Sequence, residues 1–174
     1  MLKELNALWD KLENQRQRML LMIEDLPTDR LQFAPSTDRW SILQVIQHVV
    51  QGETAMLNSE AELRNHPLRE HLQPGEMVGI VKEFLEKDMV DAVPDPSMEP
   101  DGDTTLDELR RLWHEERQAM TVLLDTVNDE NRNRVMFSHV ASGPLTALQM
   151  LEIAEAHLGT HTRQIERLLK EFPT

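Results

Sequence analysis

Two histidines near the C-terminus have the spacing that a metal site requires. His157 and His161 lie four residues apart in a segment with helical periodicity, AHLGTHTRQIERLL, so their side chains are about 40° apart on one helix face. Apolar residues share that face, which predicts that both imidazoles point into the protein. Buried polar rings need partners. One divalent metal could partner both rings, because neutral imidazole is a favoured ligand for zinc, nickel and iron.

A third histidine, His48, lies about a hundred residues earlier in another helical segment. It stands at the edge of an apolar stripe and beside the small residues Gly52 and Ala55, which leave open volume next to its ring. Three imidazoles from two helices would leave ligand positions free for water or substrate, as catalytic metal sites require. The alternatives are an ordinary surface or hydrogen-bonded role for His48, and a histidine pair packed without metal.

Charged residues also interrupt the apolar stripes of the other helical segments. Glu116 falls inside the stripe of the third, Glu53 inside that of the second, and Arg16 inside that of the first. Buried charges are tolerated when they are paired or bind metal. We expect a polar layer in which Arg16 pairs with Glu116, and Glu53 or Glu116 accepts a hydrogen bond from a metal ligand or transfers a proton. The alternative is an ion pair at a stripe edge or a dimer surface.

Two more polar residues lie close to the histidine pair in sequence. Gln164 follows His161 by one turn, so its amide could orient a ring or a bound water. His139, in the segment MFSHVASGPL before the last helix, could approach the mouth of the metal site. The simpler interpretations are a solvent-facing glutamine and an ordinary loop contact.

Four helical segments must position these residues. The apolar repeat predicts helices over residues 2–24, 41–63, 105–127 and 146–170. Three of them begin with the pattern of a capping box: Ser41 with Gln44, Thr105 with Glu108, and Thr146 with Gln149. The long connection between the second and third segments predicts a short helix over 76–87 and a solvated loop, VPDPSMEPDGD. These elements indicate one all-α domain over residues 1–174, a four-helix bundle in either up-up-down-down order or antiparallel hairpins.

Composition excludes several classes of function. The net charge of −13 would repel nucleic-acid phosphates and anionic membrane surfaces. With no cysteine, the chain can form neither a disulfide nor a thiolate metal site. The N-terminus is amphipathic and charged, unlike a signal peptide, and no stretch approaches the roughly 20 apolar residues of a membrane span. We therefore expect a cytoplasmic protein with a small-molecule substrate, and neither nucleic acid nor membrane as a partner.

Two strings carry a resemblance to a known family. RWSILQVIQHVV, followed by FSHVASGPLTALQMLEIAEAHLGTHTRQIERLL, resembles the DinB/YfiT-like superfamily of metal-dependent enzymes in order and spacing over nearly the whole chain. The resemblance implies a four-helix bundle in up-up-down-down order, with His48, His157 and His161 as ligands of a divalent zinc, nickel or iron ion.

The resemblance also implies two chemistries that the sequence leaves open. One is hydrolysis of a small substrate, and the other is transfer or isomerisation assisted by an external low-molecular-weight thiol whose sulfur would ligate the metal. The absence of cysteine is compatible with either nucleophile. A different class of function remains, namely a non-catalytic metal-binding or stress-response bundle that acts as a homodimer.

Overall fold

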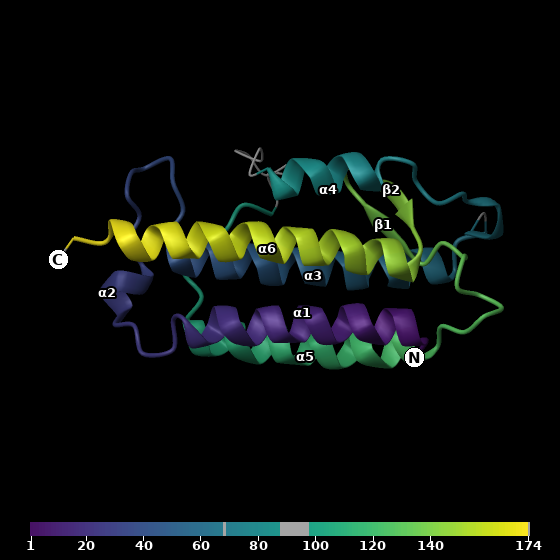
Figure 1. Cartoon of the computed structure of the whole chain (residues 1–174), viewed down its shortest axis with the longest axis horizontal. Coiled ribbons are helices and arrows are strands. Elements are labelled where there is room, and N and C mark those ends of the chain that lie inside the picture. The colour runs from purple at the N-terminus through teal and green to yellow at the C-terminus, as the bar shows by residue number, and fades with distance from the viewer. Residues whose placement is uncertain (68, 88–97, 174) are drawn as a thin grey trace.

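Four long helices form a bundle in the computed structural model, which describes residues 1–67, 69–87 and 98–173 (Figure 1). They are α1 (Lys3–Leu21), α3 (Ile42–Arg64), α5 (Leu106–Asp125) and α6 (Ala147–Glu171). The shorter elements are α2 (Thr28–Leu31), the 3-10 helix η1 (Arg69–His71), α4 (Val78–Glu86), and the strands β1 (Phe137–His139) and β2 (Gly143–Leu145). The prediction of an all-α four-helix bundle is confirmed.

The helix directions differ from the expected order. Helices α1 and α6 run one way, and α3 and α5 run the other way (Figure 1). The amino group of Met1 lies 3.0 Å from Asp125 at the end of α5, and Lys11 pairs with Glu155 near the middle of α6 at 2.8 Å. The order is therefore up-down-down-up rather than up-up-down-down. The long connection after α3 returns the chain to the start of that helix, where Gln44 donates to the Pro100 carbonyl at 3.2 Å, so α5 lies parallel to α3.

The helix starts follow their sequence signals. Full capping boxes begin α3, at Ser41 and Gln44, and α6, at Thr146 and Gln149. At the start of α5 the Thr105 hydroxyl accepts a hydrogen bond from the Glu108 backbone N–H. Each of these hydrogen bonds satisfies a backbone group that the first turn leaves without an intrahelical partner.

The segment expected as a loop before the last helix forms a two-stranded antiparallel hairpin. Phe137 pairs with Leu145 and His139 with Gly143, whose positive φ of 72° suits glycine in the turn. The Ser138 backbone N–H donates to the Ser59 hydroxyl at 3.0 Å, which ties the hairpin to α3. Strands of three residues are too short to show an alternating pattern, so periodicity cannot detect them. Residues 93–97 of the predicted acidic loop lie outside the described residues.

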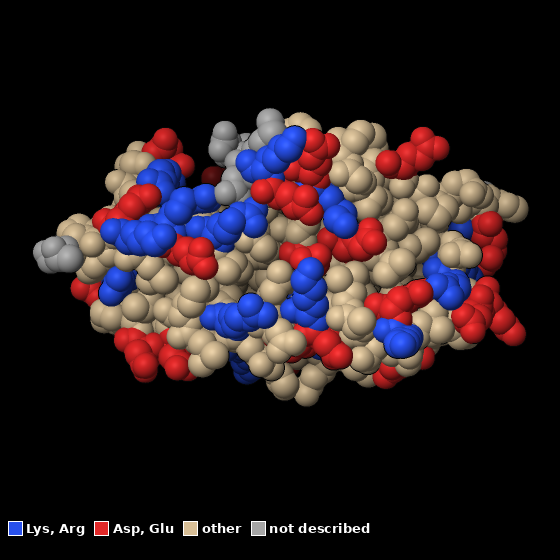
Figure 2. All heavy atoms as spheres, in the orientation of Figure 1, with Lys and Arg blue, Asp and Glu red and all other residues tan. Residues whose placement is uncertain are grey.

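The outer surface mixes the two signs of charge. On the face in Figure 2, acidic and basic groups lie next to one another, and basic groups gather over the C-terminal half of α6. Among the described helices, none has an apolar stretch long enough to cross a bilayer.

A buried arginine joins three of the helices. Arg117 on α5 is 4% exposed; its Nε and Nη2 donate to the Glu53 carboxylate on α3 at 2.7 and 2.5 Å, and its Nη1 donates to Glu13 on α1 at 3.0 Å. The guanidinium also lies 4.8 Å from the centre of the Trp9 ring. The cation is thus satisfied by two carboxylates and an aromatic face.

The predicted pair between Arg16 and Glu116 is wrong. Arg16 donates to Glu13 on its own helix at 2.9 Å, whereas Glu116 accepts a hydrogen bond from the Thr54 hydroxyl on α3. A polar layer exists as expected, but Arg117 is its central cation, because its side chain lies between two carboxylates while Arg16 has one within its own helix.

Replacing this cation should destabilise the bundle. We expect Arg117→Ala to lower the free energy of unfolding by about 3 kcal/mol, because the change leaves Glu53 and Glu13 without their shared cation. Urea unfolding measures the loss. The control is Arg111→Ala, which removes an exposed arginine of the same helix that pairs with Glu115 and should cost no more than about 0.5 kcal/mol. A loss below about 1 kcal/mol for Arg117→Ala would contradict the role assigned to the network.

Candidate metal centre

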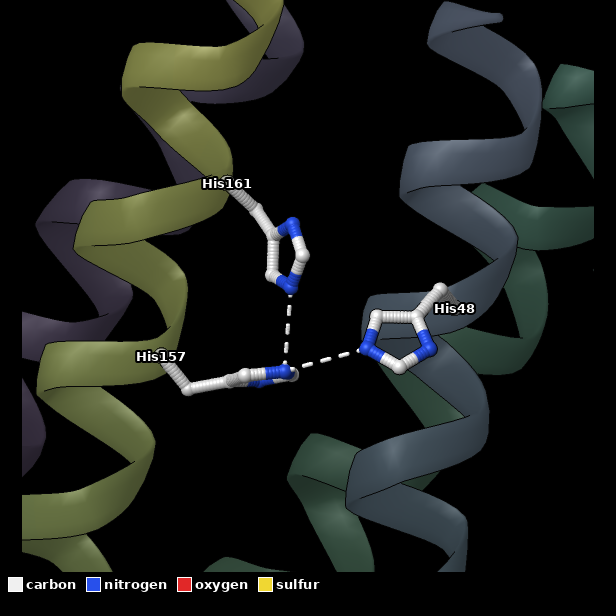
Figure 3. Close-up of side chains that lie close together, drawn as sticks. All are labelled: His48, His157 and His161. Atoms are coloured by element: carbon white, nitrogen blue, oxygen red, sulfur yellow. Dashed lines mark hydrogen bonds between the residues drawn. The ribbon is translucent and has the colours of Figure 1, made fainter. Parts of the chain in front are cut away.

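The three predicted histidines meet between α3 and α6 (Figure 3). The Nε2 atom of His157 lies 3.2 Å from Nε2 of His48 and 3.0 Å from Nε2 of His161. One ligand atom from each of the three residues lies within 4.8 Å of the other two, and no other such group of His, Asp or Glu residues occurs in the described part of the chain. The structure therefore brings together the residues that the sequence singled out.

The separations suit a shared ion. Metal–nitrogen bonds of about 2.0–2.1 Å place neighbouring ligand nitrogens roughly 3.0 Å apart at octahedral angles and 3.4 Å apart at tetrahedral angles. The two separations measured from His157 Nε2, 3.2 and 3.0 Å, fall within this range. The residues present thus fit a divalent metal.

Contacts on the outer side of two rings fix which nitrogen faces inward. His161 donates through Nδ1–H to Oε1 of Gln164 at 2.8 Å, and His48 donates through Nδ1–H to the Met98 carbonyl at 3.4 Å. Because a carbonyl oxygen can only accept, each of these rings carries its proton on Nδ1 and turns the Nε2 lone pair toward His157. Metal-binding histidines are oriented by outer contacts of this kind. Gln164 therefore contacts a ring, one of the two roles considered for it.

Burial favours the neutral form of His48 and of His157. It lowers the pKa of His48, and it lowers the pKa of His157 well below the usual value, with neighbouring His161 and His48 acting in the same direction. Neutral imidazole is the form that binds a metal.

Neighbouring residues shape the two sides of the cluster. Trp40, just before the Ser41 cap, lies 4.8 Å from the His48 ring and 6.4 Å from the His161 ring, centre to centre. On the other side, a Cβ added to Gly52 would lie 3.5 Å from Cε1 of His157, so α3 and the ring are in close contact. His48 and His161 are 7% and 8% exposed, whereas His157 keeps more accessible surface.

Comparison with known proteins agrees with this arrangement. The family model of the DinB superfamily matches residues 11–165. The chain belongs to the DinB superfamily. A solved structure that resembles this DinB-superfamily chain is YfiT from Bacillus subtilis, described as a probable metal-dependent hydrolase with an unusual four-helix bundle topology. The two share 21% identity and a TM-score of 0.59, over 98% of this chain and 89% of YfiT, a likeness that supports the fold. No curated protein matches the chain.

The two candidate catalytic carboxylates of this DinB-superfamily chain lie in the neighbouring polar layer. Glu53 is five residues beyond His48, about 140° around the helix, and it binds Arg117. Glu116 binds Thr54. In the described part of the chain, His48 contacts the Met98 carbonyl and His157, and His161 contacts His157 and Gln164. A catalytic role for Glu53 or Glu116 stays a prediction.

His139 has both a turn contact and a place near the cluster. Its Nδ1 accepts hydrogen bonds from the backbone N–H groups of Ala141 and Ser142 at 3.3 and 3.2 Å, which stabilises the hairpin turn. It is also among the groups that lower the pKa of His157. Two contacts were not predicted, the Trp40 ring and the Met98 carbonyl; a backbone carbonyl has no sequence signal, because every residue supplies one.

Glu116 has the environment of a carboxyl group that stays partly protonated at neutral pH. Burial raises its pKa to about 7, with the nearby Glu53 charge acting in the same direction and the Thr54 hydroxyl opposing. Its Oε2 atom is buried and has no hydrogen-bond partner among the described residues. A pKa raised in the folded state gives stability that is complete below the ordinary value of 4.5 and is lost as the pH rises through 7.

Replacing this carboxyl by an amide should therefore matter more at high pH. We expect the free energy of unfolding of Glu116→Gln, relative to that of the original protein, to increase by roughly 2 kcal/mol between pH 5 and pH 8, because glutamine does not ionise. Urea unfolding at both pH values measures the difference. Glu115→Gln, next in sequence on the same helix, is the control and should show no such growth. An equal effect of Glu116→Gln at the two pH values would exclude the raised pKa.

Proposed function

We propose that the chain is a metal-dependent hydrolase of a small substrate, and that His48, His157 and His161 hold its divalent metal. The observation that carries the proposal is the convergence of three Nε2 atoms at the separations of bound ligands, two of them with lone pairs directed inward by outer contacts. Membership of the DinB superfamily and the description of YfiT as a probable metal-dependent hydrolase support it.

The three imidazoles define what such a site provides. When bound, a divalent ion supplies Lewis acidity, which activates a nucleophile and polarises a substrate carbonyl. Three protein ligands leave further positions for nucleophile and substrate, unlike the four ligands of a closed structural zinc site. Gln164 and the Met98 carbonyl hold two of the rings in orientation, and Trp40 covers two of them on one side.

The same ligand set is compatible with zinc, nickel and iron, which all accept imidazole. The ligand set is also compatible with the second predicted chemistry, S-transfer or isomerisation assisted by a low-molecular-weight thiol. Because the chain has no cysteine, that thiol would be an external one. A non-catalytic metal-binding or stress-response dimer is the alternative of a different class. The homodimer stays a prediction.

Metal binding is the first test. We expect the purified protein to hold about one equivalent of divalent metal per chain, and we expect His157→Ala and His48→Ala each to lower the metal affinity at least tenfold. His114→Ala, which removes an exposed histidine of α5, is the matched control and should bind like the original. Elemental analysis and titration with zinc measure the binding. Chelation should lower the melting temperature of the original protein and leave that of His157→Ala unchanged. Less than about a tenth of an equivalent, with melting unaffected by chelation, would rule out the metal site.

Turnover is the second test. We expect the metal-loaded protein to hydrolyse members of a panel of small esters and amides, and we expect His157→Ala to lose at least about a hundredfold in kcat/KM. A parallel panel of thiol conjugations, with added low-molecular-weight thiols, separates the two chemistries. Thiol-dependent turnover without hydrolysis would replace the hydrolase by the transferase. A metal-loaded protein inactive on both panels would favour the non-catalytic alternative.

A further inference from the structure

A cavity lies between α3 and α5, against the residues that lead into the hairpin. Its volume is about 470 Å³, within the range of small-molecule sites. Its lining includes Glu60, Arg64, Arg69, Val122, Arg134 and Met136. None of these residues belongs to the histidine cluster, and Glu60 is twelve residues, or about 18 Å, farther along α3 than His48. The cavity is therefore separate from the proposed metal centre.

Arg69 brings a nearly buried guanidinium to this cavity. The residue is 7% exposed, and its Nε donates to the Val135 carbonyl at 3.0 Å. Its Nη2 lies 3.9 Å from the Glu60 carboxylate, too far for a hydrogen bond. Within residues 1–67, 69–87 and 98–173, neither Nη1 nor Nη2 has a hydrogen-bond acceptor. Both terminal nitrogens can therefore donate hydrogen bonds to an acceptor bound in the cavity.

The lining carries more positive than negative charge. Three arginines and one carboxylate, Glu60, are among its residues. Glu60 accepts hydrogen bonds from Arg64 with both oxygens, at 3.3 and 2.6 Å, and Arg134 pairs outward with Glu70. Burial is the main cause that lowers the pKa of Arg69; repulsion by the nearby charges of Arg134 and Arg64 adds to it, and Glu60 opposes it. An anion would relieve that repulsion, although the chain as a whole carries a charge of −13.

The opposite wall is apolar. Ala119, Val122 and Leu123 of α5 contribute to it together with Met136, and Val122 is 70% exposed. An inorganic anion would leave this wall in water, whereas an apolar chain would cover it. The two walls together indicate an anionic head attached to an apolar tail. A planar carboxylate suits the guanidinium, because the two groups form paired hydrogen bonds.

We propose that this cavity binds a small carboxylate with a short apolar chain. The carboxylate accepts hydrogen bonds from the terminal nitrogens of Arg69, with Arg64 and Arg134 nearby, and the chain lies against Val122, Leu123 and Met136. The carboxylate site does not depend on the metal centre. If the proposed hydrolase function fails its tests, the proposal of a carboxylate site is unaffected. If octanoate does not bind, the proposed hydrolase function is equally unaffected.

Octanoate is a suitable probe, with acetate and 1-octanol as controls that lack the tail or the charge. We expect octanoate to bind with a Kd below about 1 mM and each control to bind at least about tenfold more weakly. NMR of the metal-loaded protein, labelled with ¹³C at its methionine methyl groups, reports the place of binding. Octanoate should shift the Met136 signal and leave that of Met98, next to the histidine cluster, in place. A shift of Met98 alone, equal binding of 1-octanol, or no saturation would overturn the proposal.

Variants of the lining test the role of the cations. We expect Arg69→Lys, which keeps the charge but loses the paired hydrogen bonds, and Arg64→Gln, which loses an exposed charge, each to raise the octanoate Kd about tenfold or more. Arg111→Gln removes the same charge elsewhere on the surface and should leave the Kd within about twofold. Melting curves identify any variant that does not fold, and Arg64→Gln, exposed in the free protein, provides the test if Arg69→Lys unfolds. Equal affinities for octanoate in the original protein and Arg64→Gln would overturn the proposal.

Discussion

The contact of three imidazoles between α3 and α6 is the constraint on which the functional part of the structure depends. Packing such rings together is unfavourable when they are charged, and burial lowers the pKa of His48 and His157 accordingly. The rings also need fixed tautomers, which the Met98 carbonyl and Gln164 provide from outside. One ion can then satisfy all three inward nitrogens, so the requirements of packing and those of metal binding coincide.

Helix α3 separates this site from the other polar features by directing them to different faces. His48 faces α6, whereas Glu53 and Glu60, seven residues apart and therefore within about 20° of each other, face α5. Glu53 is neutralised by Arg117, and Glu60 is neutralised by Arg64 at the margin of the cavity next to Arg69. The two carboxylates thus satisfy cations rather than the imidazoles. Helix α3 thus contributes His48 to the candidate metal centre on one face, and Glu53 and Glu60 to the ion network and the cavity on another.

Much of the fold could be predicted because it depends on local signals. Apolar periodicity and caps such as those at Ser41 and Thr146 located the long helices, and four-residue spacing together with the family motifs located the three histidines. Contacts that depend on three-dimensional approach could not be predicted. Arg117 rather than Arg16 bridges carboxylates of two different helices, because a long side chain selects its partner only after the helices pack. Backbone carbonyls and very short strands likewise leave no pattern in the sequence.

The order of the helices explains why the histidines can meet at all. His48 is in the second turn of α3, while His157 and His161 lie on either side of the middle of α6. The antiparallel packing of the two helices brings these positions together, because the start of α3 then lies beside the later turns of α6. The ion pair between Arg39, just before α3, and Glu171, the last residue of α6, marks this alignment at 2.7 Å. The long connection after α3 can lead to a parallel α5, so the last helix returns antiparallel to α3 after a short hairpin. The crossover is therefore part of what builds the histidine cluster, even though it supplies none of the three rings.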